Sequence, residues 1–153
     1  MSESEYAGFQ AALNKEGKLA FTCRGVSMMP LLRPNRDVIV IEKKTVERCK
    51  RLDVVLFQRH GGQYVLHRVL KVYKNGYWIV GDNCVSGEDV PEERVLAVMT
   101  VVKRGKHTIY PTNKYYRIYA HLWGDLYPLR FGFLKLKSLA YRFIRPIKKK
   151  VFG

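Results

Sequence analysis

The chain of 153 residues has few cysteines and no long apolar run, and these two features argue against a metal site and against a membrane-crossing helix. Its three cysteines, Cys23, Cys49 and Cys84, lack the C-x-x-C spacing of a zinc site, so no metal is expected. An odd number of cysteines, with no secretory signal in residues 1–20, predicts reduced thiols and a cytoplasmic setting. No stretch reaches the roughly 18–20 apolar residues that a membrane-crossing helix needs.

Acidic residues are scarce in the last third of the chain. Residues 103–153 contain 13 Lys and Arg but Asp125 as their one acid, whereas residues 1–102 hold 15 basic against 12 acidic residues. Most of the formal net charge of +15 therefore belongs to the C-terminal third. Such a segment attracts phosphates, either on a membrane surface or on nucleic acid.

Two interpretations of this basic third stay open. Its helices either pack on the rest of the chain and turn a solvated basic face outward, or make peripheral contact with an anionic membrane through residues 113–153. Nucleic acid is the less favoured partner. Membrane contact gains from aromatic residues set among Lys and Arg, namely Trp123, Phe131, Phe133, Phe143 and Phe152.

Between Leu19 and Val102, short apolar stretches alternate with turns rich in Gly, Pro and Asn. This pattern predicts a mainly β fold, an antiparallel barrel or sandwich. Asn75-Gly76 predicts a hairpin turn. The expected strands are 19–22, 37–41, 53–57, 64–73, 77–80 and 95–103.

Helical patterns flank the strands on both sides. A short helix is expected over residues 5–16, stopped at Gly17. After Pro111, apolar residues recur at helical spacing from Tyr115 to Leu126 and again from Leu129 to Ile147, with Pro128 breaking the two helices apart. The expected organisation is an N-terminal helical segment at 1–18, a β domain at 19–110 and a basic amphipathic helical region at 111–153.

Four short motifs follow one another in the β portion. They are G-x-S-M-x-P at residues 25–30, D-V-V-L-F at 53–57, H-R-V at 67–69 and G-D-N at 81–83. In this order they resemble the superfamily of type I signal peptidases and LexA-like repressors, over residues 20–102. The resemblance implies an antiparallel β peptidase domain and a serine endopeptidase without a cofactor. Its substrate would be a peptide or protein segment bound in extended form.

The resemblance also implies the two central catalytic residues. Ser27 would attack the scissile carbonyl. Where bacterial signal peptidases and repressors place a lysine base, the endoplasmic-reticulum and SipW-like signal peptidases have a histidine, and this chain has His67. A histidine with its ordinary pKa of about 6.5 is mostly neutral at cellular pH and can accept the serine proton. Lys71 lies four residues past the matching position, which disfavours a lysine base.

A histidine base usually needs a carboxylate on its other ring nitrogen. The histidine-type relatives place acidic residues just after G-D-N, which points to Asp89, slightly favoured here, or to Asp82. Many signal peptidases have a hydroxyl two residues before the nucleophile, but this chain has Gly25, so backbone N–H groups near Ser27 would bind the oxyanion.

Met28 and Met29 either line the substrate groove or fill the core, since methionine adapts to both uses.

Two other functions also stay open. One is a repressor-like regulator that cuts itself or binds DNA, although about twenty residues before the β domain are too few for a helix-turn-helix. The other is a catalytically idle scaffold that docks through its basic tail.

Overall fold

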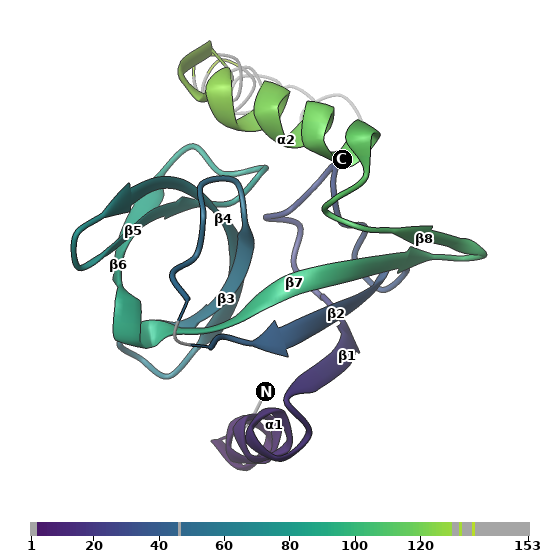
Figure 1. The fold of residues 1–153 in the computed structure, drawn as a ribbon, viewed down its shortest axis with the longest axis vertical. Helices are drawn as coiled ribbons and strands as arrows, with labels where there is room; N and C mark the ends of the chain where they lie inside the picture. Colours follow the sequence, from purple (N-terminus) through teal and green to yellow (C-terminus); the bar gives the residue numbers. More distant parts are fainter. Residues whose placement is uncertain (1–2, 46, 130–131, 133–135, 137–153) are drawn as a thin grey trace, which may run out of the picture.

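The computed structural model describes residues 3–45, 47–129, 132 and 136, and these residues form a mainly antiparallel β structure, as predicted (Figure 1). One sheet runs in the order β1-β2-β7-β3-β4-β5-β6, and β8 pairs with β7 outside this path. The strands are β1 (Lys18–Thr22), β2 (Val38–Lys43), β3 (Val54–Gln58), β4 (Tyr64–Tyr73), β5 (Gly76–Val80), β6 (Gly87–Pro91), β7 (Val95–Arg104) and β8 (His107–Ile109). The helices are α1 (Glu3–Glu16), η1 (Glu92–Arg94) and α2 (Lys114–Asp125).

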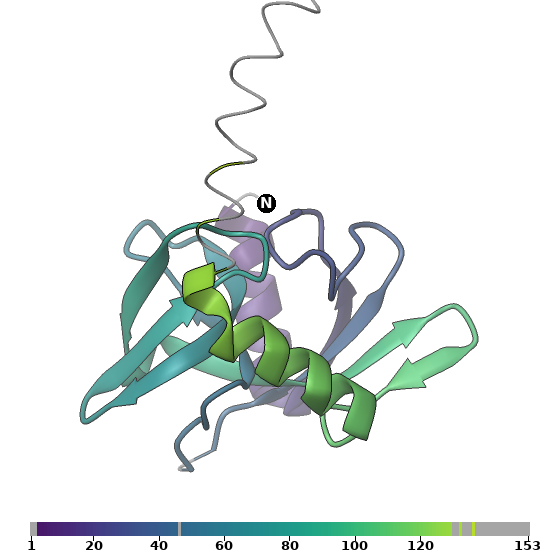
Figure 2. The same cartoon turned by 90° about the horizontal axis from the view of Figure 1, so that it is seen from above.

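The long strand β7 divides the sheet into two halves. Its first residues pair with β3, at Val95↔Phe57 and Val98↔Val55, and β2 pairs along most of its length. On one edge of β7, strands β3 to β6 curl around a common interior; on the other edge, β2 and β1 form a flatter half (Figure 1). Strand β8 pairs with the end of β7, on the edge opposite β2. Helix α2 crosses in front of the sheet, from the β5–β6 loop toward the β7–β8 hairpin (Figure 2).

Each half has its own apolar core, because side chains alternate between the two faces of a strand. In β3, Val54 and Leu56 point to the core shared with α1, β1, β2 and α2, whereas Val55 and Phe57 point to the interior of the curled half. Alternation along β4 places His67 on the interior side of the curled half, beside Phe57. The curled half therefore holds the proposed base within an apolar environment.

The six predicted strands are present with small shifts at their ends, but two strands were missed. The segment Gly87–Pro91 carries Gly, two acids and Pro, which strands disfavour, so its sequence pattern does not predict a strand. It forms β6 because it pairs with β5 at the end of the sheet path. The three-residue strand β8 completes a hairpin around Gly105, whose φ is +57°.

Helix α2 begins where the sequence predicts, since the Asn113 side chain caps it by accepting a hydrogen bond from the Tyr115 N–H. The helix predicted over 129–147 lies largely outside the described residues. In the part of the chain that is described, no helix is long and apolar enough to cross a bilayer.

Candidate active site

Ser27 lies in a tight turn between β1 and β2. The Met29 N–H donates to the Val26 carbonyl at 3.1 Å, and the following Met29–Pro30 peptide bond is cis. Met28 is 3% exposed and packs in the core, whereas Met29 is 39% exposed. Met28 therefore anchors the turn, and Met29 is the methionine that faces solvent beside Ser27.

The loop after β5 fastens this turn through Asn83. Its backbone N–H donates to the Ser27 carbonyl at 2.7 Å, and its side-chain amide donates to the Val26 carbonyl at 3.2 Å. The third residue of the G-D-N motif thus holds the backbone of the proposed nucleophile against the end of β5.

Gly81, the first residue of the same motif, lies between the backbone of Ser27 and the ring of His67. A Cβ atom there would lie 2.8 Å from the Ser27 carbonyl oxygen, 2.9 Å from His67 Nε2 and 2.6 Å from Cys84 Sγ. All three groups therefore border one small space that only glycine leaves open. No hydrogen bond joins the Ser27 hydroxyl to His67 among the described residues, and in free enzymes such bonds often form only when substrate binds.

The imidazole of His67 is buried in β4, with its ring centroid 6.1 Å from that of Phe57. Loss of hydration on burial is the main cause that lowers the pKa of His67 to about 4, while the charge of Glu88 opposes this shift and that of Arg59 adds to it. The ring is consequently neutral at cellular pH, the state that a general base needs.

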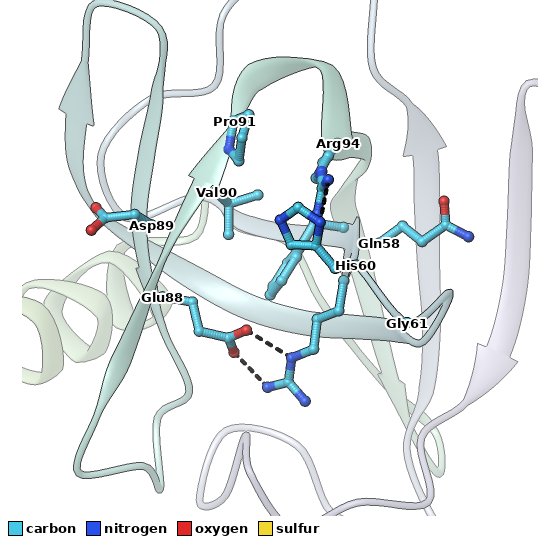
Figure 3. Close-up of a pocket in the computed structure, with 10 residues that line it drawn as sticks. Gln58, His60, Gly61, Glu88, Asp89, Val90, Pro91 and Arg94 are labelled. Carbon is cyan, nitrogen blue, oxygen red and sulfur yellow. Dashed lines mark hydrogen bonds and ion pairs between the residues drawn. The ribbon is translucent and has the colours of Figure 1, made fainter.

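Glu88 on β6 is the carboxylate that faces the second ring nitrogen. Its Oε1 lies 3.9 Å from His67 Nδ1, and that nitrogen is buried without a hydrogen-bond partner in the described part of the chain. Arg59 holds Glu88 through two hydrogen bonds of 2.7 Å and 2.5 Å (Figure 3). These bonds keep the pKa of Glu88 below its usual range, so the carboxylate is ionised.

Asp82, the second residue of G-D-N, forms a buried ion pair with Arg68. The two residues are 2% and 1% exposed, and the guanidinium donates two hydrogen bonds to the carboxylate, at 2.8 Å and 2.7 Å. Tyr119 also donates to the carboxylate, and Trp123 donates to the Asp82 carbonyl. Through these bonds Asp82 fixes the loop to β4 and α2. Removing one partner of a buried ion pair typically lowers the free energy of unfolding by about 3–5 kcal/mol.

Asp89, the other carboxylate expected beside His67, is exposed on the opposite face of β6 from Glu88. It pairs in register with Trp78, whereas Glu88 pairs with Ile79, and Figure 3 shows the two side chains pointing in opposite directions. The sequence reasoning missed Glu88. Recognising residues 87–91 as a strand would have separated Glu88 from Asp89, because neighbouring residues of a strand face opposite sides.

A cavity of about 350 Å³ opens beside the Glu88–Arg59 pair (Figure 3). The β3–β4 turn forms one wall and β6 with η1 the other, and Arg94 contacts the His60 ring at 2.7 Å on its rim.

Gly25, next to the Ser27 turn, is exposed, and a side chain there would meet no other atom within 4 Å. Among the described residues no group of three His, Cys, Asp or Glu side chains is arranged to hold a metal ion.

A scan against protein-family models finds no match to the chain, and neither does a search of curated proteins.

Proposed function

We propose that this chain is a serine endopeptidase that resembles the signal peptidases, with Ser27 as nucleophile and His67 as general base. The observation that carries the proposal is the shared space at Gly81, which the backbone carbonyl of Ser27 and the Nε2 atom of His67 both border. A neutral imidazole beside the serine turn is the arrangement that nucleophilic catalysis requires.

In the proposed reaction, His67 Nε2 takes the proton of Ser27 Oγ as this oxygen attacks the scissile carbonyl carbon. Backbone N–H groups of Ser27 and Met28 would stabilise the oxyanion. The imidazolium then gives its proton to the leaving amine as the peptide bond breaks. Water, deprotonated by His67, attacks the resulting ester, and the proton returns to Ser27 as the acid product leaves.

Glu88 is the positioning residue in this proposal, in place of Asp82 or Asp89. Burial disfavours the imidazolium, and among the charges that favour it the Glu88 carboxylate has the larger effect and Asp82 the smaller. Shortening the 3.9 Å separation between Nδ1 and Oε1 to a hydrogen bond would satisfy the buried nitrogen and stabilise the charged ring. Asp82 supports the loop through Arg68 instead.

The decisive experiment incubates the purified full chain with a proteome-derived peptide mixture and identifies new termini by mass spectrometry. Ser27→Ala and His67→Ala should each lower the cleavage rate by about a thousandfold or more, because nucleophile and base act as a unit. Ser86→Ala, which removes an exposed hydroxyl from the neighbouring loop, is the matched control and should cleave normally.

Full activity in Ser27→Ala would refute the proposal. So would a wild-type chain that neither cleaves any peptide nor becomes acylated at Ser27 by a peptide-based acylating inhibitor. Labelling of Ser27 that His67→Ala abolishes would support it and would identify the base as well.

A further inference from the structure

Helix α2 carries an apolar stripe on the face that points away from the protein. Tyr115, Ile118, Leu122 and Leu126 are 71%, 56%, 54% and 46% exposed, and Leu129 just beyond the helix continues the row. The spacing of three and four residues places these side chains within an arc of about 80°. We call these five residues the outer stripe. An exposed row of this kind marks a binding surface.

The opposite face of α2 is already occupied, so the helix cannot roll over to bury the outer stripe. Tyr116 and Ala120 pack in the core. Tyr119 and Trp123 stack on each other, with ring centroids 5.1 Å apart, and both donate hydrogen bonds to Asp82. The stripe is therefore exposed because the other face is required to hold the loop of the candidate site.

Positive charge flanks the outer stripe. Lys114 and Arg117 follow one side of it, and the Lys114 ammonium lies 5.1 Å from the Tyr115 ring centroid. Asp125, the one acid in residues 103–153, is bound to Arg51 and His121. The surroundings of the outer stripe are therefore apolar and cationic, and the carboxylate of Asp125 beside it is already paired with Arg51 and His121.

We propose that the outer stripe docks on an anionic lipid surface, with α2 lying in the plane of the interface. An apolar face beside Lys and Arg is the arrangement by which interfacial helices bind acidic lipids, with side chains among the acyl chains and cations at the phosphates. The net charge of +12 over residues 103–153 favours this occupant.

Charge also argues against the other occupants of the stripe. A second copy would bring two strongly cationic helices face to face, at a net charge of +15 per chain. Nucleic acid would satisfy the cations but would leave five large apolar side chains in water. A lipid interface satisfies both, because it offers phosphate and hydrocarbon within one surface.

This proposal does not depend on the peptidase activity, but it bears on where such an activity would lie. Trp123 and Tyr119 hold Asp82, and the Tyr127 hydroxyl donates to the Val85 carbonyl at 3.3 Å. Docking α2 on a membrane would therefore hold the loop with Gly81 close to the lipid surface.

The test is co-sedimentation of the full chain with vesicles of phosphatidylcholine alone and of phosphatidylcholine with phosphatidylglycerol. Binding to the anionic vesicles only is expected, and the double variant I118D/L122D should weaken it by about tenfold or more. The matched control is V72D/Y73D, which adds the same charge at two exposed apolar residues of β4 and should weaken binding far less.

Equal loss in I118D/L122D and V72D/Y73D would overturn the proposal, because charge alone would then explain the effect. Failure of the wild type to bind anionic vesicles would overturn it too, as would a concentration-dependent dimer that I118D/L122D disperses. Circular dichroism and thermal unfolding check that both double variants fold. Peptide cleavage in I118D/L122D, measured without lipid, separates loss of docking from failure of the proposed peptidase function.

Discussion

At the scale of single residues, Glu88 is the feature that most changes the view of the candidate site. It is the carboxylate that faces His67 Nδ1, and it is held in place by Arg59. The sequence led to Ser27 and His67 because short motifs identify those residue types directly. It did not lead to Glu88, because the face on which an acid lies depends on whether its segment is a strand.

We expect Glu88→Gln to lower kcat for peptide cleavage by about tenfold to a hundredfold, with little change in KM. The charge of Glu88 raises the pKa of His67, so its removal lowers that pKa further. The acid limb of the kcat/KM profile, where His67 becomes protonated, should therefore move to lower pH. A pH–rate series on wild type and variant measures both effects.

Glu93→Gln is the matched control for this prediction, since it makes the same substitution at an exposed acid of η1 and should leave rate and profile unchanged. Asp89→Asn tests whether Asp89 orients His67 in place of Glu88. If it does, kcat should fall in Asp89→Asn and not in Glu88→Gln. An unchanged kcat and acid limb in Glu88→Gln would remove Glu88 from the mechanism.

At the scale of elements, the site is built where the Ser27 turn, strand β4 and the loop after β5 meet. The sequence pattern predicted β4 from Tyr64 to Tyr73 with the ends that the structure shows, because a long run rich in Val and Tyr strongly favours a strand. It could not predict that the loop would be clamped by α2, since that contact joins Asp82 to Tyr119 and Trp123 across about forty residues of chain.

Gly81→Ala tests whether the close approach of these elements matters. The added methyl group would push against the Ser27 carbonyl at 2.8 Å and His67 Nε2 at 2.9 Å, and the first of these is backbone that cannot turn aside. We expect peptide cleavage to fall by at least about a hundredfold, because misplacing catalytic groups by roughly 1 Å costs that much. Steady-state kinetics measure the effect.

The control for this substitution is Gly8→Ala in α1, where an added Cβ meets nothing within 4 Å. It should leave cleavage unchanged. Circular dichroism and thermal unfolding would show that Gly81→Ala remains folded. Full activity in folded Gly81→Ala would mean that the space between Ser27 and His67 is not where the reaction occurs.

At the scale of the whole molecule, the two halves of the sheet give the site two environments. The curled half surrounds His67 with apolar side chains, and the half with β1 and β2 presents the Ser27 turn to solvent. Composition and strand pattern predicted a mainly β fold and a basic helical end. The depth at which His67 is buried was not predictable, because it follows from how β3 to β6 curl.

That burial has a consequence for the stability of the whole fold. In the unfolded chain His67 has a pKa near 6.5, whereas in the folded chain it is about 4. Between these values the unfolded state binds a proton that the folded state does not, so the free energy of unfolding decreases as the pH falls through this range. The loss contributed by His67 is absent at neutral pH and reaches up to about 3 kcal/mol once the pH has fallen to about 4.

Urea unfolding of wild type and His67→Gln, at several pH values from about 7 down to about 4.5, measures this contribution. The variant has no proton to take up at this position, so its stability should decrease less steeply with falling pH than that of the wild type. His107→Gln, at an exposed histidine of β8, should keep the wild-type slope. Parallel curves for wild type and His67→Gln would mean that the imidazole titrates normally in the folded chain, and the buried neutral base on which the proposed mechanism depends would then be wrong.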